Sequence, residues 1–236
     1  MPGVLVLNGG DEFHRGNEPQ DELLRDAAGA RAAYVVATAA REHPEAALRT
    51  AQRWFRGLGL QVSELRVRTP ADARSEETAQ RAVDAGLVYI AGGDPGRVAQ
   101  VLRGSRVWEA IAEAWRRGAA LAGSSAGAMA LCEWSLVRQG FPGHDRRRAV
   151  PALGLVPRTA VLPHFDTFGH RWIASEREAL GDDVALLGPD ERTAAVWSDG
   201  GWRCLGQGSV TVLRGDQRST FAQGEAITGL DAPVSR

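Results

Sequence analysis

The sequence predicts an α/β fold built on a mostly parallel β-sheet, and two observations support this prediction. In the first two-thirds of the chain, short apolar segments alternate with helical stretches of about ten residues, which indicates βαβ units and a parallel sheet covered on both faces. In the last third, short segments separated by Gly and Asp indicate antiparallel strands. The 236 residues, of which 44% are apolar and 24% charged, fit a single soluble domain spanning residues 1–236.

The strands expected in the parallel sheet are short apolar runs, as burial on both faces requires. They cover residues 4–7, 33–37, 62–67, 87–90 and 119–122. The antiparallel strands, expected at the edge of the same sheet, cover residues 194–198, 201–205, 210–213 and 220–223. The opening residues are interpreted as the first strand and not as a secretory signal, because no basic segment precedes the apolar run.

The helices expected between the strands are amphipathic. They cover residues 20–27, 44–58, 73–85, 95–102 and 106–117. In the segment 44–58, Ala51, Trp54 and Phe55 share one face, which is the spacing of a helix that packs on a sheet. Gly86 follows the segment 73–85, where a glycine commonly ends a helix.

Composition excludes several kinds of chemistry and partner. The net charge is −1 and no apolar run approaches 18 residues, so neither nucleic acid nor a membrane is expected as a partner. All 28 basic residues are arginine, which excludes a Ser–Lys dyad, a Schiff-base lysine, a pyridoxal phosphate anchor and a P-loop lysine. Two cysteines do not make a disulfide framework, so a cytoplasmic location is expected, and no cofactor is predicted.

The segment Gly123-Ser124-Ser125-Ala126-Gly127 matches the pattern G-x-S-x-G of a nucleophile elbow. An expected strand precedes it, and a helix-forming run, 126–132, follows it. Such a turn exposes the serine oxygen above the sheet, and flanking glycines are needed because a Cβ would collide with the adjacent strand and helix. Ser125 is therefore the predicted nucleophile of a serine hydrolase.

A serine nucleophile also needs a base and two donors for the oxyanion. Without lysine the base must be one of five histidines, and His164 directly follows an expected strand, 160–163, so it can face the same crevice. Backbone N–H groups of Ala126 and Gly93 are the predicted oxyanion donors, since Gly92-Gly93-Asp94 ends a neighbouring strand. No two histidines have zinc-ligand spacing, so no metal is expected.

Four motifs together resemble the dipeptidase E and cyanophycinase family of serine peptidases. They are Gly-Gly-Asp at 92–94, Gly-Ser-Ser-Ala-Gly-Ala at 123–128, Pro-His-Phe-Asp at 163–166 and Asp-Glu-Arg-Thr-Ala at 190–194. The resemblance implies a three-layer α/β/α fold of the class I glutamine amidotransferase (flavodoxin-like) type, often dimeric, with Ser125 as nucleophile, His164 as base and Gly93 and Ala126 as oxyanion donors. It implies small aspartate-containing substrates, either Asp-X dipeptides or the β-Asp-Arg links of cyanophycin.

The family motifs identify the third triad residue and the substrate-binding residues of this chain less directly than the nucleophile and the base. The acid that the resemblance implies is Glu191, in the segment 190–194, and Asp145 stays open as the alternative. Asp94, in the first motif, and Arg171, shortly after His164, are the predicted substrate contacts, since arginine binds carboxylates bidentately. The family often has Gln or another polar residue after the Gly-Gly-Asp or Gly-Gly-Asn motif, where this chain has Pro95, and this difference bears on the details of the substrate.

Three other interpretations of the motifs are weaker. Residues 9–13, Gly-Gly-Asp-Glu-Phe, spell a diguanylate cyclase signature, but they directly follow the first expected strand, so we interpret the match as coincidence. An α/β-hydrolase esterase also uses G-x-S-x-G, but the chain is short for that fold. An inactive member of the same fold that binds a small metabolite is the non-enzymatic alternative.

Overall fold

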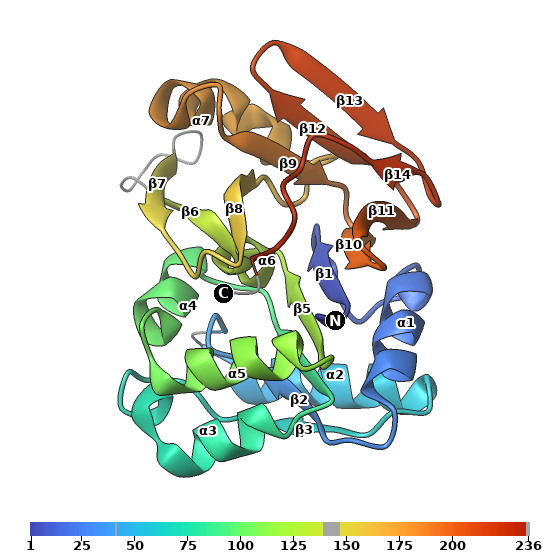
Figure 1. Cartoon of the computed structure of the whole chain (residues 1–236), viewed down its shortest axis with the longest axis vertical. Coiled ribbons are helices and arrows are strands. Elements are labelled where there is room, and N and C mark those ends of the chain that lie inside the picture. The colour runs from blue at the N-terminus through green and yellow to red at the C-terminus, as the bar shows by residue number, and fades with distance from the viewer. Residues whose placement is uncertain (41, 139–146, 235–236) are drawn as a thin grey trace.

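The computed structural model describes residues 1–40, 42–138 and 147–234, which form two β-sheets with helices around them. In Figure 1 the parallel strands of the first sheet occupy the lower half, with α3 (Glu76–Val83) and α5 (Arg106–Arg116) in front of them, and its antiparallel strands lie at the upper right. The second sheet lies in the upper half, beside α7 (Ile173–Leu180). The predicted α/β fold is confirmed.

Eight strands of the described chain form the first sheet, and five of them run parallel. Its order is β14 (Ala226–Ile227), β11 (Gly201–Gly206), β10 (Thr193–Ser198), β1 (Leu5–Asn8), β5 (Ala120–Ser124), β4 (Leu87–Ile90), β2 (Ala33–Val36) and β3 (Val62–Glu64). The neighbouring strands β1, β5, β4, β2 and β3 pair in parallel, whereas β10, β11 and β14 pair antiparallel. The carboxyl ends of β1, β4 and β5 consequently meet at one edge of the sheet.

Helices cover both faces of the first sheet, which gives three layers. Because side chains alternate along a strand, Leu5 and Leu7 of β1 join the apolar cluster under α3 and α5, while Val6 joins the cluster under the helices of the other face. These other helices are α1 (Glu18–Ala28) and α2 (Pro44–Gly57), which bury Leu24 and Phe55. The two shorter helices α4 (Pro95–Leu102) and α6 (Ala126–Leu131) follow β4 and β5.

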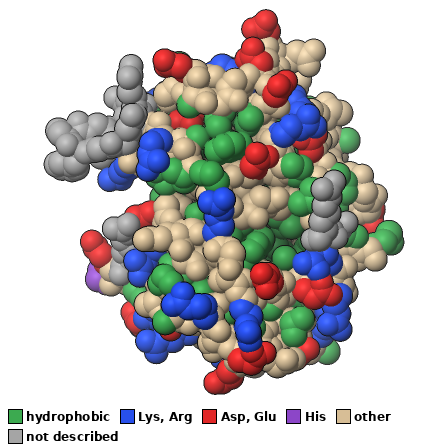
Figure 2. Space-filling view, turned by 60° about the vertical axis from the view of Figure 1, so that its left-hand side comes forward, with side chains coloured by type: hydrophobic (Ala, Val, Ile, Leu, Met, Phe, Trp, Pro, Cys, Tyr) green, Lys and Arg blue, Asp and Glu red, His purple; other side chains and the backbone are tan. Residues whose placement is uncertain are grey.

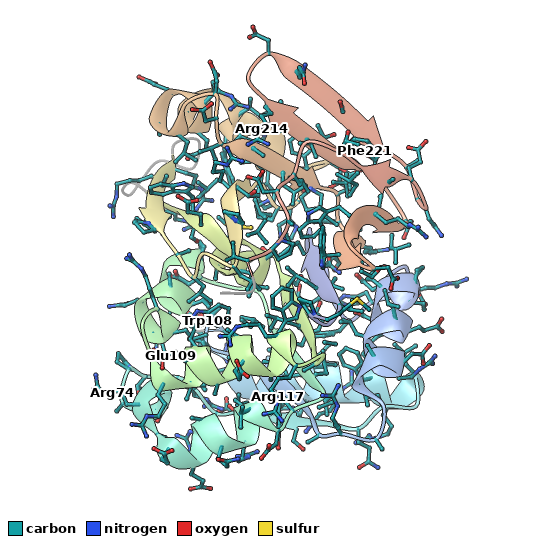
Figure 3. All side chains as sticks on the ribbon, viewed as in Figure 1. Arg74, Trp108, Glu109, Arg117, Arg214 and Phe221 are labelled. Carbon is teal, nitrogen blue, oxygen red and sulfur yellow. The ribbon has the colours of Figure 1, made fainter. Side chains whose placement is uncertain are left out.

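The second sheet contains strands that the sequence assigns differently. In the described chain its order is β13 (Gln217–Phe221), β12 (Val210–Arg214), β9 (Ala185–Pro189), β8 (Val156–Val161), β6 (Cys132–Arg138) and β7 (Arg147–Pro151). The expected meander at one sheet edge is therefore wrong in its second half. The reason is that β12 pairs with β9, and Val210 and Val212 join the apolar cluster that contains Leu186 and Leu187 of β9. Figure 3 shows Arg214 and Phe221, on β12 and β13, far above Trp108 and Glu109 of α5.

Several expected elements differ in extent, among them the strand expected at 220–223, which is observed at Gln217–Phe221. The helix expected at 73–85 is divided into a 3₁₀ turn, Asp72–Arg74, and α3, because the Ser75 side chain accepts a hydrogen bond from the Thr78 N–H and so caps a new helix. The strand expected at 62–67 ends at Glu64. A second 3₁₀ turn, Gly169–Trp172, precedes α7.

The surface charges, the helix lengths and the two cysteines complete the description of the fold. Figure 2 shows one face of the molecule, on which arginine and acidic side chains are interspersed. Among the described residues, no helix is long and apolar enough to cross a membrane, and no cluster of His, Cys, Asp and Glu is suited to a metal ion. Cys132 and Cys204 are buried as free thiols, and burial raises the pKa of each.

Candidate active site

Ser125 lies on the sharp turn between β5 and α6 that the sequence predicts. Its backbone is strained, with φ 48° and ψ −109°, a conformation that non-glycine residues seldom adopt. The flanking glycines permit this turn, since a Cβ on Gly123 would lie 2.5 Å from the carbonyl carbon of Gly127. A Cβ on Gly127 would overlap the carbonyl oxygen of Ile90 in β4. The helix α6 therefore packs directly on the carboxyl ends of two parallel strands.

The side chains of Ser125, His164 and Glu191 form a continuous hydrogen-bonded chain. The Nε2 atom of His164 lies 3.1 Å from Oγ of Ser125, and Nδ1 of His164 lies 2.7 Å from Oε1 of Glu191. His164 follows β8 and its ring stacks on Phe168, with 4.8 Å between ring centroids. The three side chains thus have the mutual geometry of a nucleophile, a base and an acid that orients the base.

Three consecutive backbone carbonyls at the end of β1 hold the segments that carry these side chains. The carbonyl of Asn8 accepts from the Ser125 N–H at 2.9 Å, and that of Gly9 accepts from the His164 N–H at 2.8 Å. The carbonyl of Gly10 accepts from the N–H of Arg192, the residue after Glu191, at 2.9 Å. Because the three acceptors are successive residues of one chain segment, the three donor segments are fixed relative to one another.

The backbone N–H groups of Gly93 and Ala126 are available to a ligand. On either side of Gly93, the Gly92 N–H donates to Glu12 at 2.8 Å and the Asp94 N–H donates to the carbonyl of Ala39 at 2.9 Å. Within the described chain, neither the Gly93 N–H nor the Ala126 N–H has a hydrogen-bond partner. Both residues line the same pocket as Ser125.

This pocket is open, has a volume of about 1080 Å³ and contains both Ser125 and His164. Of the residues that the structure describes, the charged ones that line it besides His164 are Arg138, Arg147, Arg148, Glu42 and Asp94. Arg147 is half-buried with its guanidinium 4.1 Å from the centre of the Trp172 ring. Burial and the neighbouring Arg138 lower the pKa of Arg147, so an anion in the pocket would relieve the repulsion between the two guanidinium groups.

The predicted substrate contacts occupy different surroundings. Asp94 lines the pocket, but its Oδ1 atom also caps α4 by accepting from the N–H groups of Gly96 and Arg97. Arg171 does not line the pocket of Ser125: it is exposed on a neighbouring hollow of about 750 Å³, because the 3₁₀ turn buries Gly169 and Trp172 and leaves Arg171 outside. Asp145, the alternative acid, lies outside the described residues.

Sequence reasoning missed the contribution of the segment after β1. Glu12 accepts hydrogen bonds from Gly92 and Ser124, while Asp11 forms an ion pair with Arg192. Behind this segment, burial raises the pKa of Asp21 to about 8, and the charge of Glu12 adds to the shift. The only sequence signal for these roles is the Gly-Gly motif directly after the first strand. The motif alone does not reveal which residues this segment contacts in the fold.

Comparisons with known proteins identify the family and the fold of this chain. The model of Peptidase family S51 matches residues 4–201. Cyanophycinases of Synechococcus elongatus and Trichormus variabilis are 28% and 29% identical, cover 98% of this chain and are themselves covered over 73% and 79% of their lengths. A peptidase from an acI-B1 Actinobacterium has a TM-score of 0.81 at 29% identity, covering 96% of this chain and 97% of its own. A putative Peptidase E protein from Listeria monocytogenes EGD-e shares the fold, with a TM-score of 0.59 at 16% identity over 93% of this chain and 98% of its own.

Proposed function

Since the chain belongs to peptidase family S51 and is a serine-type peptidase, we propose that it hydrolyses small aspartate-containing peptides, with Asp-X dipeptides as substrates. The observation that carries the proposal is the hydrogen-bonded chain from Ser125 through His164 to Glu191, in which Ser125 and His164 line a pocket that Arg138, Arg147 and Arg148 also line. The family match confirms the resemblance that the four motifs predict.

In the proposed mechanism, Ser125 and His164 perform two successive acyl transfers. Oγ of Ser125 attacks the peptide carbonyl carbon while Nε2 of His164 takes the hydroxyl proton. The C–N bond then breaks, His164 returns the proton to the leaving amine, and an acyl-enzyme remains. Water, deprotonated by His164, then attacks the ester carbonyl and forms a second tetrahedral intermediate. This intermediate collapses, the acid leaves, and His164 returns the proton to Oγ of Ser125.

Glu191, Gly93 and Ala126 stabilise charge in this mechanism. Glu191 holds Nδ1 of His164 and stabilises the imidazolium that forms when Ser125 gives up its proton. The N–H groups of Gly93 and Ala126 donate to the oxyanion of the tetrahedral intermediate, and loss of one such donor typically costs about 10²–10³ in rate. Their lack of partners within the described chain supports this role.

The charges of the pocket support an acidic substrate. Arg138, Arg147 and Arg148 provide guanidinium groups that can bind the free carboxylates of an Asp-X dipeptide. Arg147 takes the role that sequence proximity gave to Arg171, because it lines the pocket of Ser125 and Arg171 does not.

A second candidate substrate is the β-Asp-Arg link. The relatives named cyanophycinase match along 98% of this chain, and Glu42 lines the pocket, where it can bind a substrate guanidinium. A substrate with an arginine side chain would therefore find a carboxylate in the same pocket as the basic residues.

A peptide panel tests the proposed function. Purified wild-type enzyme is incubated with Asp-Ala, Asp-Leu, β-Asp-Arg, Ala-Ala and Ala-Leu, and free amines are quantified by mass spectrometry, with Ser125→Ala as the matched variant. We expect hydrolysis of the aspartyl peptides by the wild type, none above background by Ser125→Ala, and the same melting temperature for both. Hydrolysis by Ser125→Ala at the wild-type rate would reject the nucleophile, and cleavage of β-Asp-Arg alone would favour the second candidate. A wild type inert toward every peptide and toward a fluorophosphonate would favour a non-catalytic binding role.

A further inference from the structure

The side chain of Glu12 connects the two loops that carry the proposed oxyanion donors. Its Oε1 atom accepts from the Gly92 N–H at 2.8 Å, and its Oε2 atom accepts from the Ser124 hydroxyl at 2.9 Å. Resting on the proposed function of this site, we propose that Glu12 is a positioning residue that sets the spacing between the Gly93 and Ala126 N–H groups. Glu12 belongs to the segment 9–13, whose match to the diguanylate cyclase signature is interpreted above as coincidence. In this proposal the segment has a structural role in the peptidase site.

The first contact fixes the donor at the end of β4. Gly92 directly precedes Gly93, and the Gly93 N–H belongs to the peptide group that joins them. The peptide groups on either side of this one are held, the preceding one by Glu12, through the Gly92 N–H, and the following one by the carbonyl of Ala39, which accepts from the Asp94 N–H. With both neighbours held, the Gly93 N–H is confined to one direction, and Gly93 lines the pocket of Ser125.

The second contact fixes the donor at the elbow. Ser124 is the last residue of β5, and its backbone leads into Ser125 and then into Ala126. The Ser124 side chain is tied to Glu12, while the Ser125 N–H is tied to the carbonyl of Asn8. The strained turn at Ser125 is therefore held from both sides by the segment after β1.

The surroundings explain why the connecting group is a carboxylate. It must accept from two donors on different loops, and an ionised carboxylate has two acceptor oxygens, whereas an amide has only one. The space is narrow, since a Cβ on Gly92 would lie 2.9 Å from Oε1 of Glu12 and 3.4 Å from the Ser125 Cβ. The next residue, Phe13, packs against Tyr89 and Phe55 in the apolar cluster of this face, which holds the segment in place.

The experiment compares Glu12→Gln and Glu12→Ala with Glu22→Gln, an exposed glutamate of α1, as the matched control. Each variant is characterised by kcat and KM on the best-cleaved peptide of the panel and by its melting temperature. The rate of fluorophosphonate labelling at Ser125 is measured as well, because the phosphonyl oxygen of the adduct occupies the position of the oxyanion. Ser124→Ala and the double variant Ser124→Ala/Glu12→Gln complete a double-mutant cycle.

We expect kcat to fall about 10-fold in Glu12→Gln, which keeps one acceptor, and about 100-fold in Glu12→Ala, with KM within threefold of wild type. Labelling at Ser125 should slow in the same order, and the effects of Ser124→Ala and Glu12→Gln should be less than additive, because both break one connection. Glu22→Gln should match the wild type.

Three results would overturn the inference: kcat and labelling of Glu12→Ala within threefold of wild type, a rise in KM alone, or additive effects in the cycle. A loss that follows the melting temperature and disappears on cooling to a fully folded sample would assign Glu12 a merely structural role. If Ser125→Ala is as active as wild type, the proposed nucleophile fails, whereas an inactive Ser125→Ala beside a fully active Glu12→Ala rejects the positioning role alone.

Discussion

Substitution of Gly10 by alanine should reduce catalysis although it replaces no catalytic side chain. Gly10 has φ +137°, and a Cβ there would lie 2.6 Å from Nε2 and 2.7 Å from Nδ1 of His164. Ordinary contact begins at 3.4 Å, and Cε1 of His164 would lie closer to the added Cβ than either nitrogen, so the imidazole ring must move by more than about 0.8 Å. The ring cannot yield freely, because Phe168 stacks on it and Glu191 holds its Nδ1 atom.

A displacement of this size is large for a proton-transfer group. Misplacement of reacting groups by about 1 Å can cost about 10²-fold in rate, so we expect kcat of Gly10→Ala to fall by about that factor. The variant also strains the backbone, at a cost of about 1–3 kcal/mol, which has to be separated from the displacement of the ring. Gly59→Ala is the matched control, since Gly59 has φ +85° and no atom within 4 Å of the added Cβ.

The assay is steady-state hydrolysis of the best-cleaved peptide, with melting temperatures for both variants. Gly59→Ala should lose stability and keep its kcat, whereas Gly10→Ala should lose kcat at temperatures where it is fully folded. A folded Gly10→Ala with kcat within threefold of wild type would refute the argument that this glycine makes room for the base. An equal loss of kcat in the control would also refute it.

Two further predictions concern charge. Because burial raises the pKa of Asp21 from 3.8 to about 8, the folded protein retains a proton that the unfolded chain loses. The stability from this group is full below about pH 4 and is lost between about pH 4 and pH 8, at about 1.4 kcal/mol per pH unit. Asp21→Asn removes this dependence, so urea unfolding at pH 5, 6 and 7 should show the wild type losing stability relative to the variant, and parallel curves would contradict the assignment. Arg147→Gln should raise KM for Asp-Ala about 10–100-fold, as loss of a charged hydrogen bond of about 1.5–3 kcal/mol implies, with Arg171→Gln within twofold of wild type. The reverse ranking would return the carboxylate contact to Arg171.

Much of the fold follows from local pattern. Short apolar runs between amphipathic helices predict the parallel strands β1 to β5, because strands buried on both faces leave that pattern whatever their neighbours are. The second sheet is harder to predict, since β12 pairs with β9 although it follows β10 and β11 in the chain. The residues of β12 are apolar enough for either sheet, so the local pattern does not predict which strand β12 pairs with.

The candidate site divides in the same way. Ser125 and His164 each follow a predicted strand, so the geometry of a parallel sheet brings them to one edge without further information. Glu191 rests on the resemblance alone, because residue chemistry leaves Asp145 open. The expectation that Arg171 contacts the substrate rests on its nearness in sequence to His164. That nearness does not reveal which way the 3₁₀ turn directs the Arg171 side chain. Glu12 is 80 residues from Gly92 and 112 from Ser124, and no local pattern records such a contact.

The strain in the described backbone gathers around one segment that carries no proposed catalytic side chain. Seven non-glycine residues of the described chain have positive φ, and among them Asp11, Phe13, Ser125, His164 and Arg192 belong to the segments that meet behind the nucleophile. Each such residue costs about 1–2 kcal/mol, so together they persist only because other contacts hold them. Those contacts are the carbonyls of Asn8, Gly9 and Gly10, which bind the segments of Ser125, His164 and Glu191. Variants in this segment should therefore change kcat at least as strongly as variants of the pocket wall, because they displace several reacting groups at once.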